Sequence, residues 1–263
     1  MAIRCVYTDL DGTLLGKGAS LFRDAEGNFT LLGARALEAC HRAGAEVVIK
    51  SGRRRAQVME DARLLGQSSY IFEVGTGIVI DGELSFLTDD LQPRDDLTIH
   101  AQVERSGAPA LLLERYAGAL EPHDPWHLDR EVSHLFRGQV DTAEANALLE
   151  REGHASLRLV DNGAIGPDRH AYHLIPAVAS KARAVEVHMR ARGYAREECI
   201  AVGDSREDLD TAAVVGRFFL VANADAEARA AAAGHDNAAV TEAAMGEGFY
   251  EAVIRSMAES NTS

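Results

Sequence analysis

The sequence has few cysteines, no long apolar run and no leader-like segment. Its three cysteines, Cys5, Cys40 and Cys199, are scattered along 263 residues. They are too few for a disulfide framework or a cysteine-based zinc site, so we expect free, buried thiols in a reducing compartment. Nowhere do about 18 apolar residues follow one another, and no charged head precedes an apolar stretch at the start. We therefore predict a cytoplasmic protein without a membrane span or secretory signal.

Basic residues are also scarce relative to acidic ones. Lysine and arginine number 27 and aspartate and glutamate 41, which gives a formal net charge of −14 at pH 7. Because such a charge repels phosphate backbones and anionic lipids, we predict no nucleic-acid partner and no membrane partner. Hydrophobic residues make up 46% of the chain, enough for a substantial core in one large or two modest domains. The oligomeric state is not predicted by the sequence.

Short apolar, β-prone runs alternate with helical patterns at both ends of the chain. The predicted strands cover residues 3–8, 47–49, 70–72, 199–202 and 218–221, and the predicted helices include 31–43, 54–65 and 181–192. This alternation predicts an α/β fold with a doubly wound parallel, Rossmann-like sheet, whose ligands bind beyond the carboxyl ends of the strands. Residues 78–80, followed by Asp81 and Gly82, predict one arm of a β-hairpin.

The pattern changes between about residues 83 and 175, where prolines and histidines gather. These are Pro93, Pro109, Pro122, Pro125, His100, His123, His127, His134, His154, His170 and His173. We therefore predict that residues 85–175 form an inserted α+β domain, while residues 1–84 and 176–263 fold together as the core. The spacing of the histidines matches no metal-ligand pattern, which favours a scatter over the surface.

Acidic residues follow two of the predicted strands. Asp9 and Asp11 come directly after residues 3–8, and Asp204 and Asp208 come after residues 199–202. Clustered carboxylates are tolerable where a divalent cation lies between them, or where one is protonated for acid–base work. The alternatives are an ordinary Asp-Gly turn for the first pair and helix N-capping for the second.

Two further segments predict an anion site. Ser51 and Gly52 end a strand and precede a helix, so a hydroxyl group and free backbone N–H groups form a cradle that suits phosphate. Lys181 opens a helix, where the helix dipole disfavours a cation, and this indicates a partner anion. The alternatives are a capped helix start for Ser51 and Gly52, and a solvated surface position for Lys181.

The densest basic segment of the chain lies next to this cradle. Arg53 is a candidate for a second anionic group of a ligand, such as a carboxylate or a further phosphate. For Arg54 and Arg55 the sequence favours a solvated first helical turn. Trp126, the one tryptophan of the chain, is either a platform for a sugar ring or a hydrophobic anchor of the insert, and its type favours the anchor.

Four motifs in this order resemble those of the haloacid dehalogenase (HAD) superfamily of phosphatases. They are Asp9-Leu10-Asp11-Gly12-Thr13, Ser51-Gly52-Arg53, Lys181, and Gly203-Asp204-Ser205 with Asp208. The resemblance covers about residues 1–84 and 176–263, and the insert between the second and third motifs resembles a type IIB cap. Such caps occur in Cof-like sugar phosphatases and in sucrose-phosphate and mannosyl-3-phosphoglycerate phosphatases.

The resemblance implies a Mg²⁺-dependent phosphatase that hydrolyses a small phosphate ester, a sugar phosphate or a phosphoglycerate-type ester, through an aspartyl-phosphate. It implies that Asp9 is the nucleophile and that Asp11 is the general acid and base. The resemblance further implies that Ser51, Gly52 and Lys181 hold the phosphoryl group. It implies a Mg²⁺ site made of Asp9, Asp11 through its backbone carbonyl, and Asp204, with Asp208 supporting both the metal site and Lys181.

Two positions depart from the family pattern. Glu207 stands where members often have asparagine, and we expect this carboxylate to alter the metal affinity. Val74 follows Glu73 where members with this cap often have asparagine, and we expect a polar contact to the substrate to be lost.

Two other function classes remain as alternatives. A phospho-accepting receiver module needs about half this length and an aspartate at the third strand, where this chain has Phe72-Glu73-Val74. A catalytically silent ligand sensor does not require the pair Asp9 and Asp11.

Overall fold

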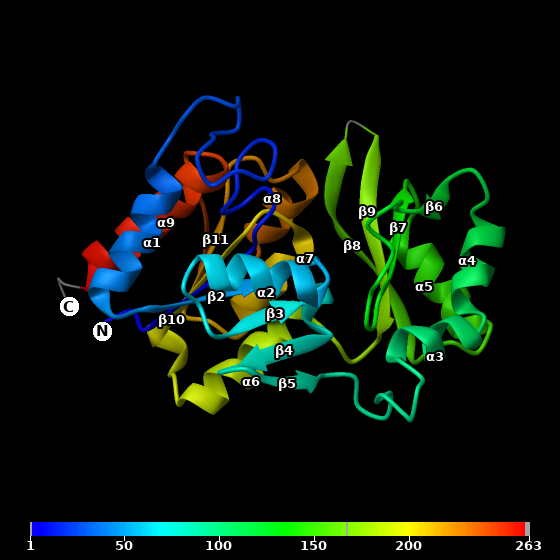
Figure 1. Cartoon of the computed structure of the whole chain (residues 1–263). Helices are drawn as coiled ribbons and strands as arrows, with labels where there is room; N and C mark the ends of the chain where they lie inside the picture. Colours follow the sequence, from blue (N-terminus) through cyan, green and yellow to red (C-terminus); the bar gives the residue numbers. More distant parts are fainter. Residues whose placement is uncertain (1, 167, 261–263) are drawn as a thin grey trace.

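The computed structural model describes residues 2–166 and 168–260, which form two β-sheets (Figure 1). The larger sheet has eight strands in the order β12-β11-β10-β1-β2-β3-β4-β5. Their bounds are β1 Cys5–Thr8, β2 Glu46–Lys50, β3 Tyr70–Phe72, β4 Gly77–Ile80, β5 Glu83–Phe86, β10 Cys199–Gly203, β11 Arg217–Leu220 and β12 Ala238–Val240. The outermost residues of the predicted core, Met1 and 261–263, lie outside the described residues.

The neighbouring strands from β12 to β3 pair in parallel, which confirms the predicted doubly wound sheet. The strands β4 and β5 add an antiparallel edge. This edge is the predicted hairpin, and its turn residues Asp81 and Gly82 both have positive φ, at 51° and 87°. A two-residue turn of this kind matches the twist of the flanking strands, which is why Asp-Gly favours it.

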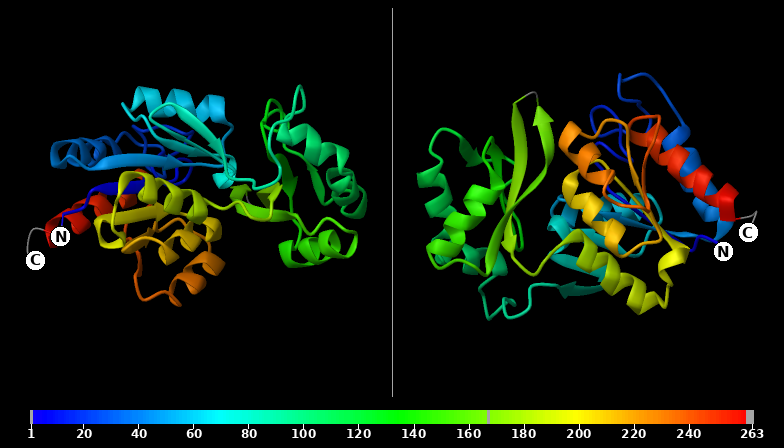
Figure 2. Two further views of the ribbon diagram at one scale, coloured as in Figure 1. Left: turned by 90° about the horizontal axis from the view of Figure 1, so that it is seen from below. Right: turned by 180° about the vertical axis from the view of Figure 1, so that it is seen from behind.

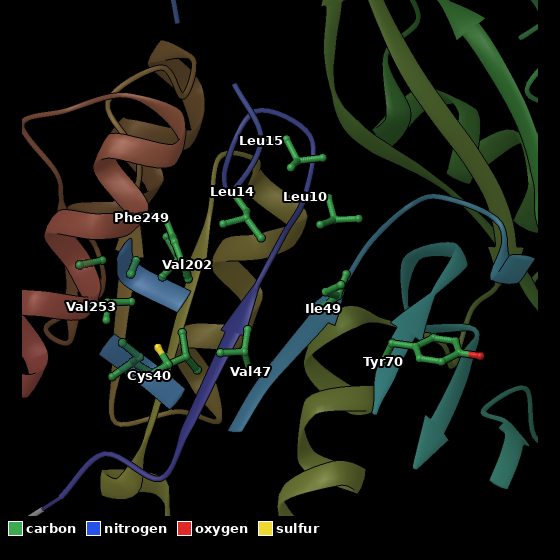
Figure 3. Packing of buried hydrophobic residues seen from close by; sticks show 14 of the residues in the cluster. Leu10, Leu14, Leu15, Cys40, Val47, Ile49, Tyr70, Val202, Phe249 and Val253 are labelled. Atoms are coloured by element: carbon green, nitrogen blue, oxygen red, sulfur yellow. The ribbon is translucent and has the colours of Figure 1, made fainter. Parts of the chain in front are cut away.

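Helices cover both faces of the larger sheet (Figure 2). One face packs against α1 Leu32–Ala43, α2 Arg55–Leu64 and α9 Met245–Ser260, and the other against α6 Lys181–Arg192, α7 Arg206–Leu209 and α8 Ala226–Ala232. Successive residues of β1 point to opposite faces, because side chains alternate along a strand. The first core lies on the face covered by α1, α2 and α9, and it contains Val6 together with Val47, Val202 and Phe249, of which the last three are labelled in Figure 3. The second core lies on the opposite face and contains Tyr7.

The predicted helix over 181–192 is confirmed, and both of its ends are capped. The Ser180 hydroxyl oxygen accepts the backbone N–H of Arg183, so Ser180 caps the first turn. Gly193 follows the last turn with φ of 64°, a left-handed conformation that glycine adopts at little cost. The position of Lys181 at the start of α6 is therefore fixed by local sequence.

The smaller sheet is antiparallel, with strands in the order β6-β7-β9-β8, and it is drawn mostly in green in Figure 1. The strands of this sheet are β6 Leu120–Pro122, β7 His134–Gly138, β8 Leu157–Gly166 and β9 Arg169–Pro176, and the helices beside it are α3 Ile99–Arg105, α4 Ala108–Arg115 and α5 Thr142–Arg151. The helices share a separate hydrophobic core with this sheet, which includes Ile99, Leu112, Leu149 and Leu174. The predicted combination of an α/β core and an α+β insert is confirmed.

The cysteines of the chain are buried and free, as the sequence predicts.

Short 3₁₀ turns complete the fold: η1 Glu73–Gly75, η2 Arg196–Glu198 and η3 Asp210–Ala213. None of the helices in the described part of the chain has the length and apolar character needed to cross a membrane.

The first core predicts a large cost for truncating a central side chain. Phe219 is fully buried in the first core, so Phe219→Ala should lower the free energy of unfolding by about 3–5 kcal/mol. Phe29 is 75% exposed, and Phe29→Ala serves as the matched control with a change of less than about 0.5 kcal/mol. Denaturant unfolding measures both values. Equal values would contradict the assignment of Phe219 to the core.

Candidate active site

The parallel pairing of β1 with β10 brings the predicted acidic residues together. Thr8 lies opposite Val202, so Asp9 and Asp204 follow the carboxyl ends of adjacent strands. Asp208 comes from α7, directly after β10. Each of these three aspartates has a carboxylate oxygen within 4.8 Å of the others. The sheet topology thus converts distant sequence positions into one carboxylate cluster.

Two buried lysines neutralise one member of this cluster. The Nζ atom of Lys181 lies 2.9 Å from Asp208 Oδ1 and 3.3 Å from Asp9 Oδ1. The Nζ atom of Lys50, the last residue of β2, lies 2.5 Å from Asp208 Oδ1. Burial alone would raise the pKa of Asp208, but Lys181, Lys50 and the Ser205 hydroxyl hold it well below its usual value. Asp208 is therefore a permanent anion that orients both lysines.

Lys50 is not among the site residues predicted from the sequence. The only available signal was its place at the end of an apolar strand, where a lysine enters the interior of a doubly wound sheet and needs a carboxylate partner. Burial lowers the pKa of Lys50, and Asp208 opposes this effect. Its contact with Asp208 makes it part of the support for Lys181.

Asp9 and Asp204 lack comparable compensation. Burial raises the pKa of Asp9 to about 6, although Lys181 acts in the opposite direction. Burial, Asp9 and Asp208 together raise the pKa of Asp204 well above its usual value. Gly12 leaves the space next to Asp204 open, since a Cβ there would lie 2.3 Å from Asp204 Oδ2. Hard carboxylate oxygens that repel one another in this way fit a divalent cation such as Mg²⁺.

The carboxylate of Asp11 lies outside this cluster. It accepts hydrogen bonds from Arg53 Nε at 2.7 Å and Arg53 Nη2 at 2.6 Å. The third guanidinium nitrogen, Arg53 Nη1, donates to Asp61 Oδ2 at 2.9 Å. Arg53 is therefore already engaged by two carboxylates, which leaves little positive charge for the ligand group predicted from the sequence. Asp11 remains half exposed at the edge of the site.

A cavity of about 730 Å³ lies beside these residues and is lined by both units of the fold. The core contributes Asp9, Asp11, Ser51, Gly52 and Asp204, and the residues around the smaller sheet contribute Trp126, Arg130, Asn162 and His173. Gly52 permits a close approach between the two units. A Cβ at Gly52 would lie 2.5 Å from Asn162 Nδ2 and 3.0 Å from His173 Nε2.

Two predictions for the insert are wrong. Trp126 is 51% exposed and lines the cavity, so it is not a buried anchor, because the smaller sheet packs its core without this ring. The histidines are not a surface scatter, since His134 and His173 are buried. The Nδ1 atom of His173 lies 3.3 Å from the Ser133 hydroxyl, a partner that sequence spacing does not reveal.

The prediction of a solvated helical turn for Arg54 and Arg55 is also wrong. Arg54 Nη1 lies 2.8 Å from Asp129 Oδ2, and Arg55 Nε lies 2.5 Å from Glu131 Oε1. The acidic partners come from the segment before β7, which the fold brings against the start of α2. These arginines join the two units.

The two departures from the family pattern also lie between the units. The buried carboxylate of Glu207 accepts a hydrogen bond from Arg158 Nη2 of β8 at 3.1 Å. Glu207 is not part of the carboxylate cluster found among the described residues, so the expected effect on metal affinity has no contact to support it. Val74 packs with Val160, Ile175 and Ala179 and does not line the cavity, so the expected loss of a substrate contact is unsupported as well.

The chain is similar in sequence to known hydrolases. A sequence model of the haloacid dehalogenase-like hydrolase family matches residues 162–243. The phosphoglycolate phosphatase of Halorubrum lacusprofundi is 32% identical over 85% of this chain and 86% of its own. That of Archaeoglobus fulgidus is 28% identical over 95% of both chains.

Solved structures share the whole fold. The sucrose-phosphatase of Synechocystis, solved with sucrose and phosphate, superposes with a TM-score of 0.72 at 16% identity, over 97% of this chain and 98% of that one. A haloacid dehalogenase-like hydrolase of B. subtilis superposes with a TM-score of 0.64 at 19% identity, over 96% and 99%.

The carboxylate cluster predicts that Asp9→Asn stabilises the metal-free protein at neutral pH. An acid whose pKa is raised on folding makes the folded state most stable below its unfolded pKa, and this stability is lost as pH rises through the folded value of about 6. Asp9→Asn has no carboxyl group to ionise at this position, so it does not lose stability as the pH rises. Lys181 still has Asp208 as an ion-pair partner in the variant. In a chelator, the melting temperature of Asp9→Asn should exceed that of wild type at pH 7.5, with a smaller difference at pH 5.

The matched control is Asp95→Asn, which changes an exposed carboxylate outside the cavity lining and should melt like wild type at both pH values. A melting temperature of Asp9→Asn equal to or below that of wild type at pH 7.5 would contradict the raised pKa of Asp9. Differential scanning calorimetry of the three proteins decides between these results.

Proposed function

The chain belongs to the haloacid dehalogenase-like hydrolases and is a phosphatase, and from this premise we propose that it is Mg²⁺-dependent and acts through an aspartyl-phosphate on a small phosphorylated metabolite. The observation that carries the proposal is the convergence of Asp9, Asp204 and Lys181 at the carboxyl ends of β1 and β10. Phosphoglycolate is the first candidate substrate, because the curated relatives bear its name. Phosphoglycerate-type esters and sugar phosphates are the next candidates.

We assign catalysis to the part of the chain that contains the larger sheet and substrate recognition to the part that contains the smaller sheet. Residues 1–84 and 176–263 would form the catalytic core, and residues 85–175 would form a cap that supplies contacts to the leaving group. The cavity supports this division, because residues of both parts line it. Among the described residues, four ion pairs between the parts favour a fixed relative position: Arg54 with Asp129, Arg55 with Glu131, Arg158 with Glu207 and Arg183 with Asp89.

Asp9, the backbone carbonyl of Asp11 and Asp204 would hold Mg²⁺, and Asp208 would support them through Lys181. When bound, the ion supplies positive charge that lets an anionic nucleophile approach an anionic phosphoryl group. The raised pKa values of Asp9 and Asp204 fit this role, because they mark two carboxylates in need of a cation.

In the first chemical step, a carboxylate oxygen of Asp9 attacks phosphorus in line and the bond from phosphorus to the ester oxygen breaks. Asp11 donates a proton to the departing alkoxide. The carboxyl group of Asp11 suits this task because it lies outside the carboxylate cluster and is held at the cavity by Arg53. The products are an alcohol and a phosphorylated Asp9.

In the second step, water attacks the phosphorus of the aspartyl-phosphate while Asp11 accepts its proton. Inorganic phosphate leaves and the carboxylate of Asp9 is restored. Throughout both steps Lys181, the Ser51 hydroxyl and the Gly52 N–H hold the phosphoryl oxygens. The Ser51 oxygen accepts the backbone N–H of Arg53 at 3.2 Å, which directs its own hydrogen elsewhere and leaves it free to donate to phosphate.

A cytoplasmic location is part of the proposal. It is supported by the cysteines, which are buried and free, as a reducing compartment maintains them.

The mechanism predicts which substitutions abolish phosphate release. Asp9→Asn should lower kcat by about 10⁴-fold or more, because it removes the nucleophile. Asp11→Asn should lower kcat by about 10²–10⁴-fold, because it removes the proton carrier. Release of phosphate from phosphoglycolate, phosphoglycerates, sugar phosphates, nucleotides and p-nitrophenyl phosphate measures both effects, with Asp95→Asn as the matched control. If folded wild type with Mg²⁺ released phosphate from none of them, a ligand-sensing role would replace the proposal.

The proposed Mg²⁺ site predicts that Mg²⁺ binding stabilises the folded protein, an effect that can be measured without substrate turnover. At about 100 times its Kd, Mg²⁺ should raise the free energy of unfolding of wild type by about 2.7 kcal/mol. Asp204→Asn should lose most of this gain, and Asp95→Asn should keep it. Thermal melts with Mg²⁺ and with a chelator provide the measurement, and an equal Mg²⁺ response in all three proteins would exclude Asp204 as a ligand.

A further inference from the structure

The cavity contains one basic side chain whose charge no ion pair neutralises. Its basic lining residues are Arg53, His123, Arg130 and His173. Arg53 is paired with two aspartates. Burial lowers the pKa of His123, and burial, Arg130 and Lys181 together hold the pKa of His173 well below its usual value, so both imidazoles are uncharged near neutral pH. Within residues 2–166 and 168–260, Arg130 forms no ion pair with a carboxylate and supplies positive charge on the side of the smaller sheet.

Two of the three guanidinium nitrogens of Arg130 are fixed by protein oxygens. Its Nε donates to the backbone carbonyl of Trp126 at 3.0 Å. Its Nη1 donates to the Gly52 carbonyl at 3.1 Å and to the Ser133 hydroxyl oxygen at 3.0 Å. The remaining nitrogen, Nη2, has no hydrogen-bond partner among the described residues, although the side chain is only 7% exposed. Because Arg130 lines the cavity, this nitrogen can donate to an anion or water there.

A carboxylate behind Arg130 holds this arrangement rigid. Glu73 is fully buried and accepts the backbone N–H groups of Glu131, Val132 and Ser133 at 2.9, 3.2 and 2.7 Å. It also accepts the Ser133 hydroxyl hydrogen at 2.9 Å, which turns the lone pairs of that oxygen towards Arg130. Glu73 lies on the larger sheet, next to β3, so its contacts fix the Arg130 segment relative to the core. Ser133 separates the two charges, and Glu73 does not contact the guanidinium directly.

The position of Arg130 relates its free nitrogen to the proposed phosphate site. Gly52 offers its N–H to the phosphoryl group in the proposed function, and the carbonyl of the same residue accepts Arg130 Nη1. An anion bound at Nη2 would therefore lie close to a phosphoryl group bound at Gly52. Only a short organic spacer fits between two anionic groups so placed.

We propose that Arg130 binds a carboxylate of the leaving group, which selects short phosphate esters with a carboxylate near the ester oxygen. This inference rests on the proposed phosphatase function and names the part of the substrate that the smaller unit recognises. The cavity of about 730 Å³ is larger than such an ester, so the preference comes from charge and not from steric exclusion. Phosphoglycolate has the required chemistry.

The test compares two esters with two-carbon leaving groups, phosphoglycolate, which ends in a carboxylate, and 2-hydroxyethyl phosphate, which ends in an uncharged hydroxyl group. Wild type should prefer phosphoglycolate in kcat/KM by about 10- to 100-fold, the range that a charge-assisted hydrogen bond provides. Arg130→Gln should reduce this ratio to about threefold or less, whatever the absolute rates, and Arg130→Lys should restore part of it. Arg137→Gln is the matched control, because Arg137 pairs with Glu121 and does not line the cavity.

Two results would overturn the inference. One is a wild-type ratio of the two kcat/KM values near one. The other is an Arg130→Gln variant that loses rate equally on both esters, since that would show that Arg130 only positions Gly52 and does not bind the carboxylate. Calorimetric binding of the same esters to Asp9→Asn, with and without Arg130→Gln, repeats the comparison without turnover. Failure to release phosphate would then count against the proposed function, and failure to discriminate in binding would count against Arg130.

Discussion

A carboxylate buried between two lysines is the interaction on which the rest of the site depends. Asp208 contacts Lys50 at the end of β2 and Lys181 at the start of α6, and the three side chains are fully buried. Removing one partner from a buried ion pair typically costs about 3–5 kcal/mol, so the three groups hold one another in place. Because Lys181 is oriented in this way, its ammonium group reaches Asp9, which places a fixed positive charge beside the proposed nucleophile.

A second buried carboxylate has the same role between the two units. Glu73 accepts several hydrogen bonds from the segment before β7, and in doing so it fixes Arg130 near Gly52. Asp208 therefore organises the side of the cavity where the phosphoryl group is proposed to bind, and Glu73 organises the opposite side. Neither residue needs to touch the reacting atoms, since each acts by holding a cation in a defined position.

The sequence predicted the parts of the structure that depend on local pattern. Apolar runs followed by acidic residues located β1, β10, Asp9 and Asp204, because strand ends and helix caps are encoded within a few residues. The contacts between the units were not predictable in this way. Arg55 forms an ion pair with Glu131, and Arg158 with Glu207, only after the chain has folded. No periodic sequence pattern links positions so far apart. Lys50 was missed for the same reason, since its partner Asp208 lies 158 residues away.

The proposed mechanism requires that Asp9 carries the phosphoryl group during turnover. Wild type mixed with phosphoglycolate and Mg²⁺, quenched in acid and digested, tests it by mass spectrometry, because an acyl phosphate survives brief exposure to acid. We expect one added phosphoryl group on the peptide that contains Asp9, and none when Mg²⁺ is omitted. A phosphoryl group on another residue, or none on Asp9 during steady release of phosphate, would contradict it.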